Sequence, residues 1–241
     1  MISVIIPAFN ESRRLSPTLV ELHIFMKETP GLIGEVVLVD DGSTDKGLTV
    51  ERAMAWMGRL PLKIIRLEKN KGKWAAIRIG IAAAKYDAVL LLDADGSASV
   101  RELETITGVK SLLQMRVAVF GSRFKKGASV EGKTAMRKFI SWGYKVYASF
   151  WYWFATGRKN IDDMQCPLKL IYKSKIDLDE LVVNRFSGDI ELACNYKGRI
   201  VNYPVQFIHK AGSKLPFSAI FSMAIETVEV AMRYRRSKRG N

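Results

Sequence analysis

Residues 88–96 read Ala-Val-Leu-Leu-Leu-Asp-Ala-Asp-Gly, a run of five apolar residues that ends in two carboxylates. Continuous rather than alternating hydrophobicity is typical of a strand that is buried on both faces of a parallel sheet. Two other runs have this form: Val4-Ile5-Ile6 leads into Pro7, and Val36-Val37-Leu38-Val39 leads into Asp40-Asp41-Gly42-Ser43. Open α/β sheets bind ligands at the carboxyl ends of their strands. We therefore expect a ligand site where these three polar loops converge.

The remaining pattern is that of a doubly wound fold followed by a different C-terminal half. We expect strands at 63–67 and 117–120, a helix capped by Ser16-Pro17, and another helix over 74–85. Beyond residue 121 we expect a long aromatic helix over about 133–156, an irregular stretch at 162–168, a helix near 188–197, a strand over 199–208 and a terminal helix from about 217. The sequence predicts one α/β domain over 1–241, with a mostly parallel sheet flanked by helices and with amphipathic helices near its C-terminal end.

Basic residues are concentrated in the second half of the chain. Lys and Arg total 38 against 24 Asp and Glu, for a formal net charge of +14. Residues 1–120 hold 16 basic and 14 acidic side chains, whereas residues 121–241 hold 22 and 10. The second half is therefore expected to face something anionic, such as phosphates, lipid headgroups or nucleic acid.

Several function classes are disfavoured by what the sequence lacks. Two cysteines and two histidines argue against a disulfide framework and a zinc site. There is no signal-peptide pattern at the N-terminus and no run of about 20 apolar residues, so we expect a cytoplasmic protein that is not integral to a membrane. The absence of G-x-G-x-x-G and of G-x-x-x-x-G-K-[ST] argues against a dinucleotide dehydrogenase and a P-loop NTPase.

Asp93 and Asp95 are the candidate metal ligands. In an extended backbone, side chains two positions apart point the same way, so both carboxylates can bind one hard cation. Mg²⁺ or Mn²⁺ held there keeps positions free for diphosphate oxygens and can neutralise a departing nucleoside diphosphate. A D-x-D pair also occurs by chance in solvated turns, so its place among the other strand-end loops matters.

The order of the strand-end motifs supplies that context. Ile6-Pro7-Ala8-Phe9-Asn10-Glu11, then Val39-Asp40-Asp41-Gly42-Ser43, then Asp93-Ala94-Asp95 resembles the N-terminal half of the family 2 glycosyltransferases of the GT-A fold. The resemblance implies that 1–120 binds a nucleotide sugar and that 121–241 binds the acceptor and faces a membrane. It also implies that Asp93 contacts the nucleotide or metal and that Asp95 binds the metal.

Later motifs resemble the branch that charges polyprenyl phosphates with a sugar. They are Asn70-Lys71-Gly72-Lys73, Gly121-Ser122-Arg123, Arg137 with Ser141, Asp163-Met164-Gln165-Cys166, Phe186 with Asp189 and Glu191, and Gly212-Ser213-Lys214-Leu215. The sequence departs from that branch at Trp74, where small residues are usual, and at Pro167-Leu168, which replaces a Gly-Phe pair. Gly96-Ser97 lacks the Leu-Gln of the mannosyl enzymes, which favours glucose.

The resemblance assigns roles to two sets of residues. The nucleotide-sugar set is Pro7, Ala8, Asn10, Glu11, Asp40, Asp41, Lys73, Asp93, Ala94, Asp95, Gln165 and Lys214. The catalytic set is Asp95, Arg123, Arg137, Ser141, Asp189 and Glu191. The implied reaction moves a sugar, with glucose from UDP-glucose expected first, onto dolichyl or another polyprenyl phosphate with inversion at the anomeric carbon.

The acceptor chemistry leaves alternatives. A phosphate monoester has a second pKa near 6 and is largely anionic at neutral pH, so it needs cations more than a base; Arg123, Arg137 and Lys214 are candidates. GDP-mannose as donor remains open, as does a hydroxyl acceptor, for which Asp189 or Glu191 becomes a necessary base. A nucleic-acid-binding protein is disfavoured because no recognised RNA or DNA motif is present.

The C-terminal half carries the pattern of a membrane-binding surface. Between Phe139 and Phe154 nine of sixteen residues are aromatic. The segment 217–232 is amphipathic and leads into five basic residues between Arg233 and Arg239, a form suited to lying on anionic lipid. We expect a peripheral protein on the cytoplasmic face of a membrane, and the aromatic helix could belong to the core or face the lipid.

Overall fold

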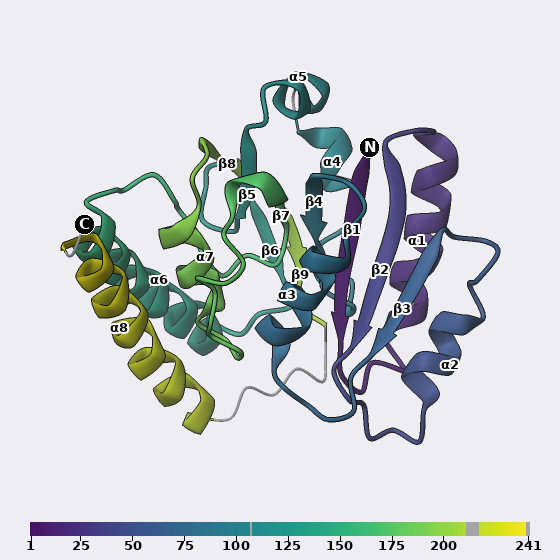
Figure 1. The fold of residues 1–241 in the computed structure, drawn as a ribbon, viewed down its shortest axis with the longest axis horizontal. Helices are drawn as coiled ribbons and strands as arrows, with labels where there is room; N and C mark the ends of the chain where they lie inside the picture. The colour runs from purple at the N-terminus through teal and green to yellow at the C-terminus, as the bar shows by residue number, and fades with distance from the viewer. Residues whose placement is uncertain (107, 211–216, 240–241) are drawn as a thin grey trace.

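The computed structural model describes residues 1–106, 108–210 and 217–239 and has three layers, with a sheet between two sets of helices (Figure 1). The central sheet has seven strands in the order β3-β2-β1-β4-β7-β5-β8. They span Ile2–Ala8 (β1), Ile33–Asp40 (β2), Leu62–Arg66 (β3), Ala88–Leu91 (β4), Ala118–Ser122 (β5), Lys169–Tyr172 (β7) and Ile200–Pro204 (β8). The predicted fold class, α/β with a mostly parallel sheet flanked by helices, is confirmed.

Strand β7 runs against both of its neighbours, β4 and β5, while the other pairs of the central sheet are parallel. No strand was expected between the irregular stretch at 162–168 and the helix near 188–197, so β7 is an addition to the predicted elements. The predicted strand 199–208 is also divided at Val205 into β8 and β9 (Gln206–Ile208). β9 pairs with β6 (Ser129–Glu131) in a small parallel sheet beside the central one.

Alternate residues of the central strands pack on opposite faces of the sheet. Ile2, Val4 and Ile6 of β1 belong to the core under α1 (Leu15–Glu28) and α2 (Leu48–Met54). Ile5 belongs to the core under α3 (Lys73–Ala83), α6 (Ala135–Thr156) and α7 (Gly188–Asn195). Short helices α4 (Glu102–Thr105) and α5 (Val109–Gln114) and a 3₁₀ turn at Lys173–Lys175 complete this part. Helix α1 begins one residue before the Ser16-Pro17 pair that was expected to cap it.

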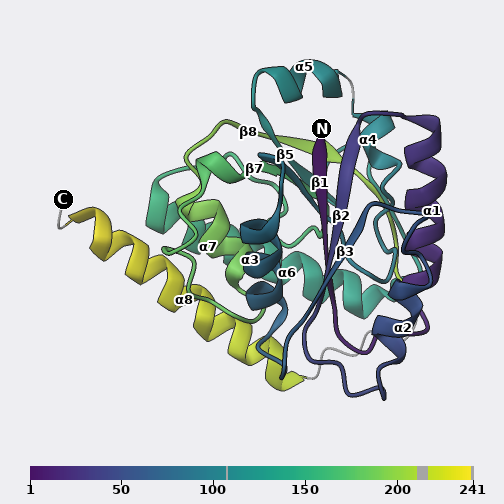
Figure 2. The same ribbon diagram turned by 45° about the vertical axis from the view of Figure 1, so that its right-hand side comes forward.

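Helices α6 and α8 (Phe217–Arg239) lie side by side at one end of the molecule, away from α1 and α2 (Figures 1 and 2). Tyr144 hydrogen-bonds Thr227, and the Tyr147 hydroxyl donates to the Ala224 carbonyl, so polar contacts join the two helices. The side chain of Thr134 caps the N-terminus of α6 by accepting from the amide of Arg137. Within the described residues, the helices are too short or too polar to cross a membrane.

Candidate active site

The loops after β1, β2 and β4 meet at one edge of the sheet, as expected from the parallel strand order. They enclose a cavity of about 410 Å³, which we call the strand-end pocket. Its lining includes Pro7, Ala8, Glu11, Arg14, Asp41, Lys73, Asp93, Ala94, Asp95 and Phe186. Most of the residues that the resemblance assigned to the nucleotide sugar therefore lie together.

A second cavity, of about 560 Å³, opens beside the first and lies against the N-terminal part of α6; we call it the helix pocket. Its lining includes Arg123, Lys133, Arg137, Ser141, Gln165, Asp189 and His209. Lys73, Asp93, Asp95 and Phe186 line both cavities. The two pockets therefore meet at the carboxylate pair, which is where a donor and an acceptor would have to meet.

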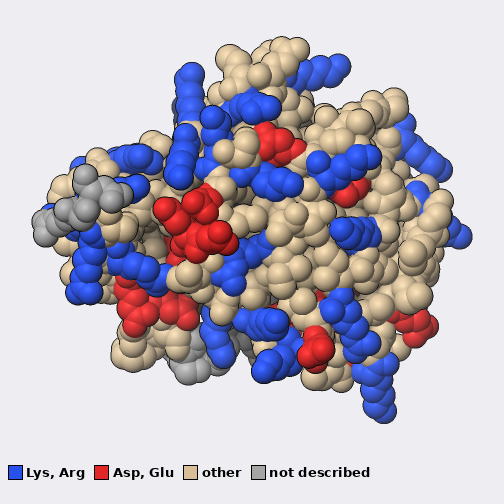
Figure 3. All heavy atoms as spheres, in the orientation of Figure 1, with Lys and Arg blue, Asp and Glu red and all other residues tan. Residues whose placement is uncertain are grey.

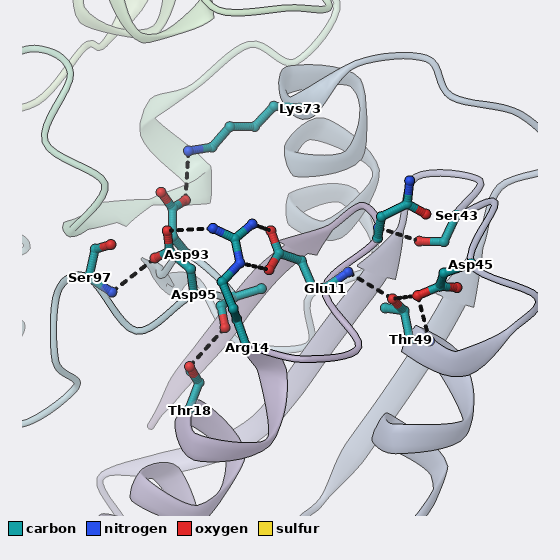
Figure 4. A network of polar contacts seen from close by, with 12 residues as sticks. Glu11, Arg14, Thr18, Ser43, Asp45, Thr49, Lys73, Asp93, Asp95 and Ser97 are labelled. Carbon is teal, nitrogen blue, oxygen red and sulfur yellow. Dashed lines mark hydrogen bonds and ion pairs between the residues drawn. The ribbon is translucent and has the colours of Figure 1, made fainter. Parts of the chain in front are cut away.

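Each carboxylate of the pair is close to a cation (Figure 4). Lys73 Nζ lies 2.6 Å from Asp93 Oδ1, and Arg14 Nη1 lies 3.7 Å from Asp95 Oδ2. Arg14 also makes two hydrogen bonds to the Glu11 carboxylate, of 2.6 and 2.8 Å. Burial by itself would lower the pKa of Lys73, but Asp93 and Asp189 raise that pKa above the ordinary lysine value. Burial raises the pKa of Glu11 although Arg14 opposes the change.

The carboxylate pair fits a divalent cation that takes its other ligands from substrate. No group of three or more His, Cys, Asp or Glu in the described part of the chain is placed to hold a metal. Mg²⁺ is usually held by one or two carboxylates together with substrate phosphates and water. Asp93 and Asp95 supply those two carboxylates at the wall of the strand-end pocket. A closed, protein-only metal centre does not fit these residues.

Asp40, Asp41 and Asn10 serve the pocket in different ways. The Asp41 carboxylate accepts from the amides of Lys71 and Gly72, at 2.8 and 2.9 Å, and so shapes the loop before α3. Asp40 is fully buried and accepts from Ser43, and Asn10 bonds Thr44; neither Asp40 nor Asn10 lines the strand-end pocket. The Asn10 contact joins the β1 loop to the β2 loop, and the Asp40 contact lies within the β2 loop.

Arg123, Arg137 and Ser141 all line the helix pocket. Arg123 is paired with a carboxylate, whereas Arg137 contacts a histidine. Arg123 makes two side-chain hydrogen bonds to Asp163, of 2.7 and 3.0 Å. Burial would lower the pKa of Arg123, but Asp163 raises it above the ordinary arginine value. Arg137 donates to His209 Nε2, and burial together with Arg137 lowers the pKa of that histidine.

Asp189 lines the helix pocket, but both of its oxygens already accept hydrogen bonds. Oδ1 accepts from the buried Lys169 at 2.5 Å, and Oδ2 accepts from the indole of Trp74 at 3.1 Å. Trp74 fits because residue 188 is glycine, where a Cβ would meet the indole at 2.2 Å. The unusual residue at position 74 is thus part of the support for Asp189.

Glu191 is not brought to either pocket. Its buried carboxylate accepts from the Val183 amide at 2.8 Å and from Arg233 of α8 at 3.0 Å. Residue 191 lies where α7 packs against α8, and the catalytic role expected of it stays a prediction. Lys214 and the Gly212–Leu215 motif lie outside the described residues.

Sequence reasoning missed four residues of this site: Arg14, Lys133, Lys169 and His209. Arg14 precedes a helix and Lys133 follows a glycine in a basic stretch, so both resemble ordinary surface cations. The one available signal for Lys169 was its position within a short apolar run. That position indicates a buried lysine, and a buried lysine needs a carboxylate partner.

Comparison with known proteins places the chain in a family. The sequence profile described as Glycosyl transferase family 2 matches residues 3–168, more than half of the chain. The chain belongs to glycosyl transferase family 2. Among curated relatives of this family 2 chain, human dolichyl-phosphate beta-glucosyltransferase is 30% identical over 97% of this chain and 75% of its own length. A Trichomonas vaginalis protein with the same name is 29% identical over 96% of this chain and 71% of its own.

Solved structures confirm the expected GT-A fold for this family 2 chain. Glucosyl-3-phosphoglycerate synthase from Mycobacterium tuberculosis, in complex with Mn²⁺, UDP-glucose and phosphoglyceric acid, superposes with a TM-score of 0.66. The match covers 98% of this chain and 79% of that one at 17% identity. A structure of the same synthase with Mg²⁺ and UDP also has a TM-score of 0.66, at 18% identity.

Proposed function

We propose that this family 2 chain transfers glucose from UDP-glucose to dolichyl phosphate or a related polyprenyl phosphate, with inversion at the anomeric carbon. The relatives named dolichyl-phosphate beta-glucosyltransferase support this assignment, since they match almost the whole chain at 27–30% identity. The two pockets that share Asp93 and Asp95 support a two-substrate reaction at that point.

The main support for a phosphate acceptor comes from the surroundings of the two candidate bases, Asp189 and Glu191. Both oxygens of Asp189 accept hydrogen bonds, and Glu191 is buried away from the pockets. A hydroxyl acceptor needs a general base to take its proton, whereas a phosphate oxygen is already anionic at neutral pH and needs none. The helix pocket instead presents Arg137 and Lys133, cations suited to a phosphate.

The residues of this chain have distinct roles in the proposed transfer. Pro7, Ala8 and Asp41 line the donor site, and Lys73 supplies positive charge beside the diphosphate. Asp93 and Asp95 would hold Mg²⁺ or Mn²⁺, which stabilises negative charge developing on the leaving diphosphate. Arg137 and Ser141 bind and orient the acceptor phosphate, with Arg123 behind them. Lys169 and Trp74 fix the position of the Asp189 side chain in the pocket wall.

A lipid acceptor requires a membrane-facing surface, and we assign it to α6 and α8. From Phe139 onward every exposed position of α6 is apolar: Phe139, Trp142, Val146, Phe150 and Trp153. These positions are three or four residues apart and form one stripe along the helix. Phe221 and Ile225 of the neighbouring α8 are also exposed. Contiguous apolar stripes on a water-soluble surface mark binding sites, and Trp and Tyr favour the headgroup layer.

Charge supports the cytoplasmic face of an anionic membrane as the location. On the face that Figure 3 shows, Lys and Arg are widely spread, whereas Asp and Glu gather in a few small clusters. Arg236 and Lys238 are exposed on the last turns of α8. Met136 and Ile140 of α6 and Ile220 and Met223 of α8 line the helix pocket, which offers an apolar path from the phosphate site towards this surface.

The test is a donor and acceptor panel with the purified chain and Mg²⁺. UDP-glucose, UDP-galactose and GDP-mannose are each offered with geranyl phosphate and with geraniol, the matched acceptor that lacks the phosphate. We expect glucose transfer from UDP-glucose to geranyl phosphate, a β-linked product by NMR, and no transfer to geraniol. Transfer only to geraniol would reject the phosphate acceptor, and transfer only from GDP-mannose would reject the glucosyl donor.

A further inference from the structure

Lys133 lies just before α6 and lines the helix pocket, as the carboxylate pair also does. Its Nζ donates to Ser141 Oγ at 3.0 Å and lies 5.5 Å from the centre of the Phe207 ring. The Arg123 guanidinium lies over the same ring at 5.3 Å. Lys133 is therefore held in place by an uncharged partner and an aromatic face, with another cation close by.

The surroundings of Lys133 are short of negative charge. The titratable and charged groups that face it are Arg123, Arg137, Asp163, Cys166 and His209. Asp163 is committed to Arg123, and burial raises the pKa of Cys166 to about 12, so its thiol is neutral. Burial, together with Arg123 and Arg137, lowers the pKa of Lys133 to about 8. Within the described ranges, neither Lys133 nor Arg137 forms an ion pair with a carboxylate, unlike Lys73, which also lines the pocket.

On the basis of the proposed transfer to a polyprenyl phosphate, we propose that Lys133 binds the acceptor phosphate and distinguishes the acceptor dianion from the singly charged product. A dianion attracts and keeps the Lys133 proton, because each opposite charge nearby stabilises the ammonium form. A monoanion stabilises the ammonium form of Lys133 less than a dianion does. Lys133 thereby favours acceptor binding and product release in the same pocket.

The charge change follows from the reaction itself. A non-bridging oxygen of the acceptor phosphate forms a bond to the anomeric carbon, and the bond from that carbon to the diphosphate oxygen breaks. UDP leaves with the bonding electron pair, so no proton needs to move. The acceptor phosphate has a second pKa near 6 and enters as a dianion at neutral pH. It becomes a diester with one negative charge.

This role predicts a specific pH dependence. Above pH 8 the empty pocket has lost the Lys133 charge, so acceptor binding must restore a proton and the acceptor KM rises with pH. The KM for UDP-glucose does not follow this rise, because Lys133 lines only the helix pocket. A lysine that merely supported the fold would change neither KM in this way.

The experiment compares Lys133→Gln, Lys133→Arg and the control Lys126→Gln, whose exposed lysine lies outside both pockets. Losing a hydrogen bond to a charged group at Lys133→Gln should raise the geranyl phosphate KM roughly 10- to 100-fold at pH 7. The UDP-glucose KM should stay unchanged. Lys133→Arg should bind geranyl phosphate at pH 7, lose the rise in KM above pH 8, and be inhibited more strongly by product. Lys126→Gln should match the wild type.

A binding measurement in the absence of UDP-glucose tests this inference separately from the proposed function. Isothermal calorimetry at pH 7 compares geranyl phosphate with its methyl diester, a singly charged match for the product. The wild type should prefer the monoester, and Lys133→Gln should lose most of that preference. The role of Lys133 would be overturned if Lys133→Gln kept the preference for the monoester. It would also be overturned if the variant raised the KM of both substrates equally and had a lower melting temperature. A wild type that shows the Lys133-dependent preference but transfers no glucose would reject the proposed function alone.

Discussion

At the scale of single residues, Asp95 joins the two pockets and is the residue on which metal use depends most. Replacing it by Asn removes one charged ligand, so Asp95→Asn should abolish Mg²⁺- or Mn²⁺-dependent transfer. The fold should survive, because the residue lies in a loop at the pocket wall. Electron paramagnetic resonance of free Mn²⁺ in the presence of UDP should show weaker binding than in the wild type. Full activity of the variant, or of the wild type in excess chelator, would contradict the metal assignment.

Arg123 and Arg137 line the same pocket, yet their loss should have different effects on stability. Arg123→Ala leaves the buried Asp163 without its partner and should lower the free energy of unfolding by about 3–5 kcal/mol. Arg137 is exposed, so Arg137→Ala should change it by less than about 0.5 kcal/mol. Both should reduce transfer strongly. Urea denaturation measures the difference, and equal stability of the two variants would contradict the buried pair.

The same pair predicts an acid-sensitive stability. Burial would raise the pKa of Asp163, but Arg123 holds that pKa below the ordinary aspartate value. A lowered folded-state pKa contributes stability above the unfolded value of about 3.9 and loses it as pH falls through the folded value. The urea concentration at the unfolding midpoint of the wild type should therefore fall as the pH is lowered below about 4. Asp163→Asn should lose stability at neutral pH and show a smaller drop; an identical pH profile would contradict the assignment.

At the scale of elements, the packing of α3 against α7 places Asp189. A methyl group at Gly188 would overlap the Trp74 indole, so Gly188→Ala should destabilise the protein by about 1–3 kcal/mol. The same change in a Trp74→Ala background should cost less, because alanine lacks the Cγ and Cδ2 atoms that lie nearest to the added methyl group. A double-mutant cycle by urea denaturation measures this coupling. Additive effects would mean that the two helices adjust independently.

Most elements were predictable from local pattern, and the exceptions have physical causes. Strand β7 was missed because Lys169 interrupts its apolar pattern, and the carboxylate that pairs with this lysine, Asp189, lies 20 residues along the chain. Short helices α4 and α5 have few apolar positions from which to recognise a period. The amphipathic character of α6 was visible in its spacing, but which face is exposed depends on where α7 and α8 pack.

At the scale of the whole molecule, membrane binding should have two separable parts. Trp142→Ser with Phe150→Ser should weaken binding to neutral and anionic vesicles alike, since it removes apolar insertion. Arg236→Gln with Lys238→Gln should weaken only the anionic, salt-sensitive part, because each basic residue near such a surface contributes about 1 kcal/mol. Vesicle sedimentation at low and high salt measures both.

The matched control for that experiment is Val20→Ser with Ile24→Ser, on α1, far from α6 and α8 (Figure 1). It should leave vesicle binding unchanged. Truncation after Met232 would be a poorer test, because it also removes the Arg233–Glu191 ion pair and Arg235, which lies 4.1 Å over the Phe154 ring. Equal binding by the wild type and the α6 double variant would reject the stripe as the membrane contact.

The amino-acid sequence by itself determined the α/β class, the strand-end loops, the carboxylate pair and the family, because these depend on consecutive residues and on the order of motifs. Only the tertiary structure decided how the charges are paired. It paired Glu191 with Arg233, gave Asp189 two donors and added Arg14, Lys133 and His209 to the pockets. Trp74 and Asp189 are 115 residues apart along the chain, yet 3.1 Å separate their bonded atoms. Electrostatic interactions depend on distance in space, which packing sets and local sequence does not contain.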